Sequence, residues 1–528
     1  MPIKRLTDIG GEFPAWSGDG KQVHWSLGNA HVVYDLDRAK VVDDSLRVVN
    51  RAAADSVRRA AADTATRRPP ATVATDTTKK PKAGYKPEER RIEIRAARDI
   101  PTGTVVLRGA RVVTMKGDEI IDDADIVVTG SRIVSIGRRG TSAPPSNATV
   151  IDVAGKTIVP GFVDTHYHSQ WLIPGVHTTQ TWQYLATLAY GVTTTRDPQT
   201  ATTDVLTYAD RVESGAMVGP RTYSTGPGVF GGYQGESIKD LDHARNILKR
   251  YAQYYDTKTI KMYMAGNRQQ RQWVIMAARE LGIMPTTEGG LDFKLEMTHA
   301  LDGYPGIEHS FPIAPIYEDV IGMLSFAQVT NTPTLLVSYG GPFGENYWYT
   351  NTEVHNDTKL AHFTPEAELD QKTRRRTGNG AGGWYRKDEY VFPQHAAFVR
   401  DLVKAGGRVG VGSHGQLQGL GYHWEMWSLA SGGLDNLNVL RVATRFGAEA
   451  IGMGDDIGSI EPGKFADLVI FDRDPVADLQ NTTSIHYVMK NGRLYEGETL
   501  NEVWPRKQAL PVQPWMHTAP VGVNAGIR

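Results

Sequence analysis

The stretch from Gly155 to His168, which reads GKTIVPGFVDTHYH, decides the expected fold. Its first part is rich in β-branched and apolar residues, as in a buried strand, and it ends in His166, Tyr167 and His168. Because side chains alternate between the two faces of a strand, His166 and His168 point to the same side and can bind one metal ion together. A His-x-His pair is a weak signal by itself, so the surrounding sequence carries the argument.

Short apolar or β-branched runs continue beyond this stretch and alternate with helical patterns. The helical patterns are clearest at residues 243–255, 272–282 and 394–406. This alternation predicts an α/β fold, a (β/α)8 TIM-like barrel, whose active site forms at the carboxyl ends of the strands. The eight expected strands are Thr157 to Thr165, Gly191 to Asp197, Arg221 to Gly226, Thr259 to Tyr263, Ile283 to Glu288, Gly306 to His309, Pro333 to Val337 and Arg408 to Ser413.

Runs of β-type sequence separated by Gly-rich and Asp-rich turns flank the barrel on both sides. They predict a small β-sandwich built from both ends of the chain. We expect its first half over residues 101–156, the barrel over 157–456, its second half over 457–498 and a C-terminal tail over 499–528.

Residues 1–38 alternate short β-runs with turn signals, and the phrases PAWSGDGK and VYDLD resemble one blade of a TolB-type β-propeller. A lone blade cannot bury its faces, so this resemblance implies a longer parent protein, and a short β-meander is the alternative. Residues 39–100 are expected to be a linker, partly helical and then disordered, because the tract at 67–87 lacks apolar periodicity.

The composition limits the partners. The net charge of −1 favours neither nucleic acid nor an anionic membrane, so we expect a small-molecule or peptide substrate and a homo-oligomer. The chain has no cysteine, so metal ligands must be His, carboxylates or a modified Lys. No signal peptide or membrane span is evident, and the compartment is not encoded: a parent protein would be periplasmic or secreted, and otherwise the chain would be cytoplasmic.

Three phrases in order resemble the amidohydrolase superfamily, and most closely its imidazolonepropionase-like and prolidase-like branch. They are GKTIVPGFVDTHYH, TGSRIVSIG at residues 129–137 and GSIEPGKFADLVIFD at residues 458–472. The resemblance extends from Thr104 to Gly497. It implies a binuclear metal site made by the His-x-His pair, a carboxylated Lys on strand four, and His residues on strands five and six. A strand-eight Asp then activates the bridging water.

Carried over by position, the resemblance assigns Lys261 in TIKMYMAG as the lysine that becomes a carbamate, and His309 in GYPGIEHS as the strand-six ligand. An unmodified ammonium would repel the cations, whereas a carbamate would bridge them. Tyr263 lies two residues after Lys261 on the same strand face and is a candidate for binding a substrate carboxylate or carbonyl. We expect zinc, as one or two ions.

Two positions depart from the family pattern. Strand five offers Glu288 in place of His, and strand eight offers His414 in place of Asp. A carboxylate is an acceptable zinc ligand, and an imidazole with a pKa near 6.5 can move a proton from a metal-bound water. Either His414 is the base, or His414 binds metal while Glu288 is the base. The family pattern and this chain each have one carboxylate and one imidazole at these two positions. The two substitutions therefore look compensatory, which argues against an inactive protein.

These features predict an enzyme, a metal-dependent hydrolase that cleaves amide or peptide-like C–N bonds in dipeptides or N-acyl amino acids. The first alternative is a deaminase or decarboxylase on the same scaffold. The second is an inactive binding or scaffold protein. Assays of ammonia and amino-acid release separate the enzymes, and metal analysis tests the scaffold.

Overall fold

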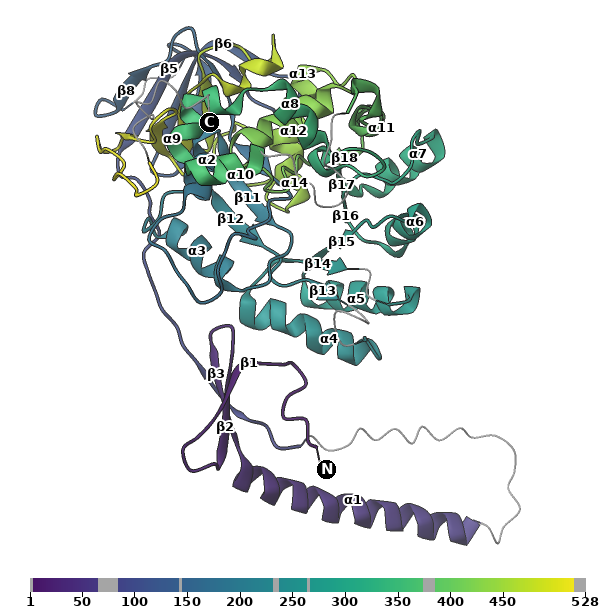
Figure 1. Cartoon of the computed structure of the whole chain (residues 1–528). Helices are drawn as coiled ribbons and strands as arrows, with labels where there is room; N and C mark the ends of the chain where they lie inside the picture. Colours follow the sequence, from purple (N-terminus) through teal and green to yellow (C-terminus); the bar gives the residue numbers. More distant parts are fainter. Residues whose placement is uncertain are drawn as a thin grey trace. The chain divides into compact units, whose positions relative to one another are not determined.

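The computed structural model of the chain describes residues 3–64, 84–141, 145–230, 237–263, 266–373 and 385–516 (Figure 1). It divides into two compact units. One comprises Met1–Arg95 with Asn246–Asp256, and the other comprises Ala96–Arg245 with Thr257–Arg528. The tract at residues 67–87, expected to be disordered, lies largely outside the described residues.

The N-terminal unit contains a small antiparallel sheet with the strand order β1-β2-β3-β4. Its core is formed by Trp25, Val32 and Tyr34, with Tyr254 packed against them. The fourth strand lies inside the range expected to be a linker, and whether the sheet is a propeller blade stays a prediction. The elements are β1 (Glu12–Trp16), β2 (Gln22–Leu27), β3 (Ala30–Asp35), α1 (Leu36–Thr64) and β4 (Glu88–Arg91).

The two predicted β-rich flanks join into one mixed sheet in the second unit. Its order is β22-β21-β20-β19-β9-β5-β6-β7, with β8 pairing with β5. Strand β9 contacts both flanks, because it pairs antiparallel with β19 and parallel with β5. The strands are β5 (Thr104–Val113), β6 (Ile120–Thr129), β7 (Arg132–Arg138), β8 (Thr149–Asp152), β9 (Thr157–Pro160), β19 (Leu468–Phe471), β20 (Ile485–Lys490), β21 (Arg493–Glu496) and β22 (Glu502–Trp504).

Parallel strands form two further sheets, β10-β11-β12 and β13-β14-β15-β16-β17-β18. Backbone amides join them on one side, since Thr165 donates to Val411 at 2.8 Å and His414 donates to His166 at 2.7 Å. The sheets thus make two arcs of a barrel, and their complete closure stays a prediction. The strands are β10 (Phe162–Asp164), β11 (Val192–Asp197), β12 (Arg221–Ser224), β13 (Val229–Phe230), β14 (Thr259–Tyr263), β15 (Met284–Glu288), β16 (Gly306–Glu308), β17 (Thr330–Thr332) and β18 (Arg408–Val409).

Helices follow the parallel strands along the chain, and α5, α6 and α7 lie along one side of β14 to β17 in Figure 1. The expected helix at 243–255 begins at Leu241 and continues after Lys249 as a π-helix over Arg250–Tyr255. The helices are α2 (Trp182–Ala189), α3 (Asp204–Glu213), α4 (Leu241–Lys249), α5 (Arg268–Leu281), α6 (Phe293–Asp302), α7 (Glu318–Ala327), α8 (Gly344–Asn351), α9 (Thr358–Phe363), α10 (Glu366–Thr373), α11 (Phe392–Lys404), α12 (Leu420–Ala430), α13 (Asn436–Arg441) and α14 (Gly447–Ala450). Among the described helices, none is long and apolar enough to cross a membrane.

The first expected strand is divided between two sheets. Residues Thr157–Pro160 pair in the mixed sheet, and only Phe162–Asp164 belong to the parallel one. The break falls at Gly161, where a Cβ atom would lie 2.1 Å from Oγ1 of Thr193. Only glycine allows this close approach. The boundary expected at residue 157 between sandwich and barrel therefore lies at Gly161 in the structure.

The prediction of a strand over Pro333 to Val337 is wrong. The strand at this place in the chain is β17, which ends at Thr332. Leu335–Val337 form a 3-10 helix after Thr334, which has a left-handed φ of 45°. The amides of Leu335 and Leu336 donate to the carboxylate of Glu425 at 2.7 and 3.0 Å. In a strand these backbone amides would donate to a neighbouring strand, and here they donate to a side chain of α12 instead.

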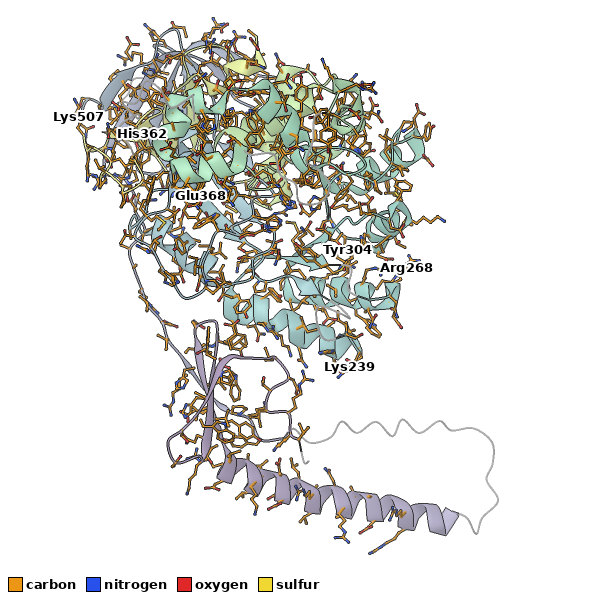
Figure 2. The ribbon with its side chains drawn as sticks, viewed as in Figure 1. Lys239, Arg268, Tyr304, His362, Glu368 and Lys507 are labelled. Carbon is orange, nitrogen blue, oxygen red and sulfur yellow. The ribbon has the colours of Figure 1, made fainter. Side chains whose placement is uncertain are left out.

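Contacts between neighbouring helices hold the β14 to β16 region together. Arg268 at the start of α5 pairs with Asp302 at the end of α6, 2.7 Å away. The buried hydroxyl of Tyr304 donates to the carbonyl oxygen of Arg271 at 3.1 Å. Arg268 and Tyr304 are both labelled in Figure 2. Tyr304 thereby fixes the segment that leads into β16 to α5.

The buried carboxyl group of Glu425 is expected to make the stability of the folded chain depend on pH. Burial raises its pKa from 4.5 to about 8, although the two amides oppose this shift. Protonated Glu425 therefore stabilises the folded state. This stabilisation is complete at a pH below the pKa that Glu425 has in the unfolded chain, and it is lost as the pH rises through about 8. Over this window the free energy of unfolding should fall by up to about 1.4 kcal/mol per pH unit. We expect Glu425→Gln to flatten the pH dependence of thermal unfolding, and an unchanged dependence would contradict this.

Candidate metal centre

The His-x-His pair lies directly after β10, at the carboxyl end of a parallel strand. Both side chains are buried, and their Nε2 atoms lie 3.0 Å apart. The backbone amide of Tyr167 donates to the carbonyl oxygen of Arg196 at 2.9 Å, so the segment stays aligned with β11. The structure therefore brings His166 and His168 together, as strand alternation predicts.

The Nδ1 atoms of both histidines face hydrogen-bond acceptors. Nδ1 of His166 lies 2.7 Å from Oε2 of Glu308, and Nδ1 of His168 lies 2.9 Å from the carbonyl oxygen of Gln199. Each Nδ1 therefore carries the proton, which leaves a lone pair on each Nε2. Two lone pairs that face each other at 3.0 Å repel unless a cation lies between them. This arrangement fits a bound metal ion.

His309 and His414 complete a cluster of imidazoles. One ligand atom from each of His166, His309 and His414 lies within 4.8 Å of the others. The ring of His168 is centred 4.7 Å from that of His414. Both His309 and His414 have left-handed backbones, with φ of 72° and 59°, a strained conformation often found at functional sites.

Lys261 and Glu288 extend the cluster on the other side. Nζ of Lys261 lies 2.7 Å from Oε2 of Glu288, and Oε1 of Glu288 lies 3.2 Å from Nε2 of His309. Lys261 is completely buried on β14. Tyr263 is close, because Nζ of Lys261 lies 4.7 Å from the centre of its ring. The structure thus brings together all seven residues predicted for the site.

Burial controls the charge states of the imidazoles. It lowers the pKa of His168 to about 3, and it holds the pKa values of His166 and His414 well below their usual range, with a further contribution from the ammonium of Lys261. These three rings are therefore neutral near pH 7. Neutral imidazole is the form that binds a metal ion or accepts a proton.

Glu288 and Lys261 stabilise each other's charge. Burial alone would raise the pKa of Glu288, but His309 and Lys261 hold it well below its usual range. Burial would lower the pKa of Lys261, but the carboxylate of Glu288 raises it. Glu288 is therefore an anion that can bind a metal ion. A carbamate could form on Lys261 only after the ammonium loses its proton.

Three residues near the cluster were not predicted. The hydroxyl of Tyr339 donates to Oε1 of Glu288 at 3.4 Å. Glu308 and Arg196 form a buried ion pair of 2.5 Å behind His166. The only sequence signal for Glu308 and Arg196 is their position on the strands β16 and β11, and no pattern distinguishes them from other strand residues. Tyr339 follows the 3-10 helix, whose geometry depends on a distant carboxylate.

Comparisons with known proteins agree with this geometry. Residues 351–495 match the model of the amidohydrolase family. The solved structure of a Xaa-Pro dipeptidase with methionine bound in its active site matches with a TM-score of 0.56 and 19% identity. That match covers 75% of this chain and 100% of the dipeptidase. At this level of identity it shows a shared fold.

Curated relatives match over short segments only. An adenine deaminase of Deinococcus deserti is 36% identical over 81 residues, which are 15% of this chain and 14% of that protein. An imidazolonepropionase of Streptomyces griseus is 47% identical over 49 residues, which are 9% of this chain and 12% of that protein. The matched segments of this chain therefore span only 14% and 12% of the lengths of these two relatives.

The resemblance to the amidohydrolase superfamily is confirmed. A segment of the chain matches the amidohydrolase family, and its fold, in which parallel strands make two arcs of a barrel beside a β-rich domain, is similar to that of the Xaa-Pro dipeptidase.

Proposed function

We propose that this chain is a metal-dependent hydrolase that cleaves amide or peptide-like C–N bonds. The observation that carries the proposal is the pair of Nε2 lone pairs of His166 and His168, which face each other 3.0 Å apart beside two more imidazoles. A family match and a dipeptidase-like fold support the same class of reaction.

His166, His168, His309, Glu288 and a carbamate on Lys261 would hold one or two divalent ions, and zinc suits this set of nitrogen and oxygen ligands. A bound ion would lower the pKa of a water molecule and polarise the substrate carbonyl. The side chains of this chain would move the proton and bind the substrate.

Two residues can carry the proton from the water to the departing nitrogen. His414 is a neutral imidazole within the cluster, so it can accept the proton and then donate it. Glu288 is the alternative carrier if His414 binds metal. The positions of these two residues support an exchange of roles between strands five and eight of the family pattern.

Tyr263 would bind the substrate. Its hydroxyl donates to Oε1 of Gln199 at 3.3 Å, and its ring lies beside Lys261, so the side chain is held at the edge of the cluster. The hydroxyl could donate to a substrate carbonyl or carboxylate there. We propose dipeptides or N-acyl amino acids as substrates, and the dipeptidase-like fold supports this choice. A homo-oligomer and a periplasmic or secreted parent protein stay predictions.

A deaminase is the second candidate, because an adenine deaminase is among the curated relatives. The zinc-loaded chain should be assayed with dipeptides, N-acyl amino acids and adenine, while free amino acid and ammonia are measured separately. Our proposal predicts release of amino acids and no ammonia from adenine. Release of ammonia from adenine alone would favour the deaminase. No turnover of any substrate by the zinc-loaded chain would favour a binding or scaffold protein.

A further inference from the structure

Glu308 is the last residue of β16, and its side chain contacts His166 on the side away from the proposed metal site. Its side chain is 1% exposed. The residue has no place among the proposed ligands or proton carriers, yet it touches His166 directly. A buried carboxylate requires compensating donors, so its contacts show what it does.

The two oxygens of Glu308 have different partners. Oε1 accepts hydrogen bonds from Nη2 of Arg196 and Oγ1 of Thr286, each at 2.5 Å. Oε2 lies 2.7 Å from Nδ1 of His166. Oε1 is therefore occupied by two donors, and Oε2 is directed to the imidazole.

Arg196 fixes the orientation of the carboxylate. Its Nε donates to the carbonyl oxygen of Thr165 at 2.8 Å, one residue before His166. The guanidinium is 3% exposed and can only donate, so the group opposite it must accept. The carboxylate cannot rotate without leaving a buried cation unpaired, which would be strongly destabilising.

We infer that Glu308 is a positioning residue that keeps the proton of His166 on Nδ1 and directs its Nε2 lone pair to the metal. This inference rests on the proposed metal centre. A carboxylate that accepts from a ligand imidazole fixes both the tautomer and the ring orientation, and it strengthens metal binding. Glu308 would thus act through His166 and lies outside the proposed set of ligands.

The test is Glu308→Gln. In this variant the amide oxygen must face Arg196 and Thr286, because both donate there. The amide nitrogen then faces Nδ1 of His166, which must accept, so the proton moves to Nε2. We expect zinc affinity to fall about 10- to 100-fold. The matched control is Thr286→Val, which removes one donor to Oε1 and leaves the contact with His166; its zinc affinity should stay close to that of the wild type.

Two measurements read the result apart from catalysis. Zinc affinity is measured by competition with a chromophoric chelator, and the tautomer of His166 is measured by NMR of the metal-free chain with isotope-labelled histidine. A proton on Nδ1 in the wild type and on Nε2 in Glu308→Gln would support the inference. A proton on Nε2 in the wild type would overturn it, even if the variant fails to fold. Equal zinc affinity in wild type and folded Glu308→Gln would also overturn it.

Failure of the proposed function would look different. In that case the zinc-loaded wild type would bind metal and show the expected tautomer, yet hydrolyse no amide. The NMR result therefore decides the role of Glu308 independently of the reaction.

Discussion

Replacing His166 by alanine is expected to remove zinc binding and to lower the rate of amide hydrolysis at least about a thousandfold, or about 4 kcal/mol in barrier. The reason is that His166 is central to the cluster. Its Nε2 faces that of His168, and its ring is centred 4.8 Å from that of His309 and 5.0 Å from that of His414. The His166→Ala variant therefore loses the imidazole that lies next to His168, His309 and His414.

The measurement is bound zinc per chain together with the rate on the best substrate of the panel. A matched control is His355→Ala, because His355 is half exposed and, among the described residues, its ring nitrogen contacts Asp370 and Thr373 and no member of the cluster. The control should keep both zinc and rate. Full activity in His166→Ala would contradict a metal centre at this position.

The second large effect concerns the exchange of roles between Glu288 and His414. We expect Glu288→His alone and His414→Asp alone each to lower the rate about a hundredfold or more, because each leaves these two positions with two imidazoles or two carboxylates in place of one of each. The double variant restores one of each, in the arrangement typical of the family. It should therefore be more active than either single variant.

A double-mutant cycle measures this coupling directly. The expected result is a rate in the double variant at least about tenfold above that of either single variant, with zinc bound in all three. Thermal unfolding of each variant shows whether it is folded. Effects that multiply in the double variant would mean that the two residues act independently, and the proposed exchange would be wrong.

The sequence predicts which residues lie together better than it predicts the details of the fold. All seven predicted residues meet because strand alternation and the carboxyl ends of parallel strands bring them together, and both rules are local. The family resemblance supplied Lys261 and His309, which short patterns could not separate from ordinary strand ends. Glu308 was missed because a Glu before a predicted ligand, at the end of a three-residue strand, has no distinctive pattern.

The missed features of the fold have long-range causes. Leu335 to Val337 have the composition of a strand, but the carboxylate of Glu425, ninety residues away, accepts from the amides of the 3-10 helix. The break at Gly161 depends on Thr193 in the neighbouring strand. The N-terminal sheet takes its last strand from residues after the long helix α1, and no periodicity in that charged stretch indicates it.

The most direct test of the central claim is a zinc titration of the metal-free chain in bicarbonate buffer, with amino-acid release from a dipeptide or N-acyl amino acid followed at each step. We predict that the metal-free chain is inactive and that the rate rises with bound zinc until one or two ions are held per chain. A rate that is independent of bound zinc, or a chain that binds no zinc at all, would contradict the proposal that this protein is a metal-dependent hydrolase.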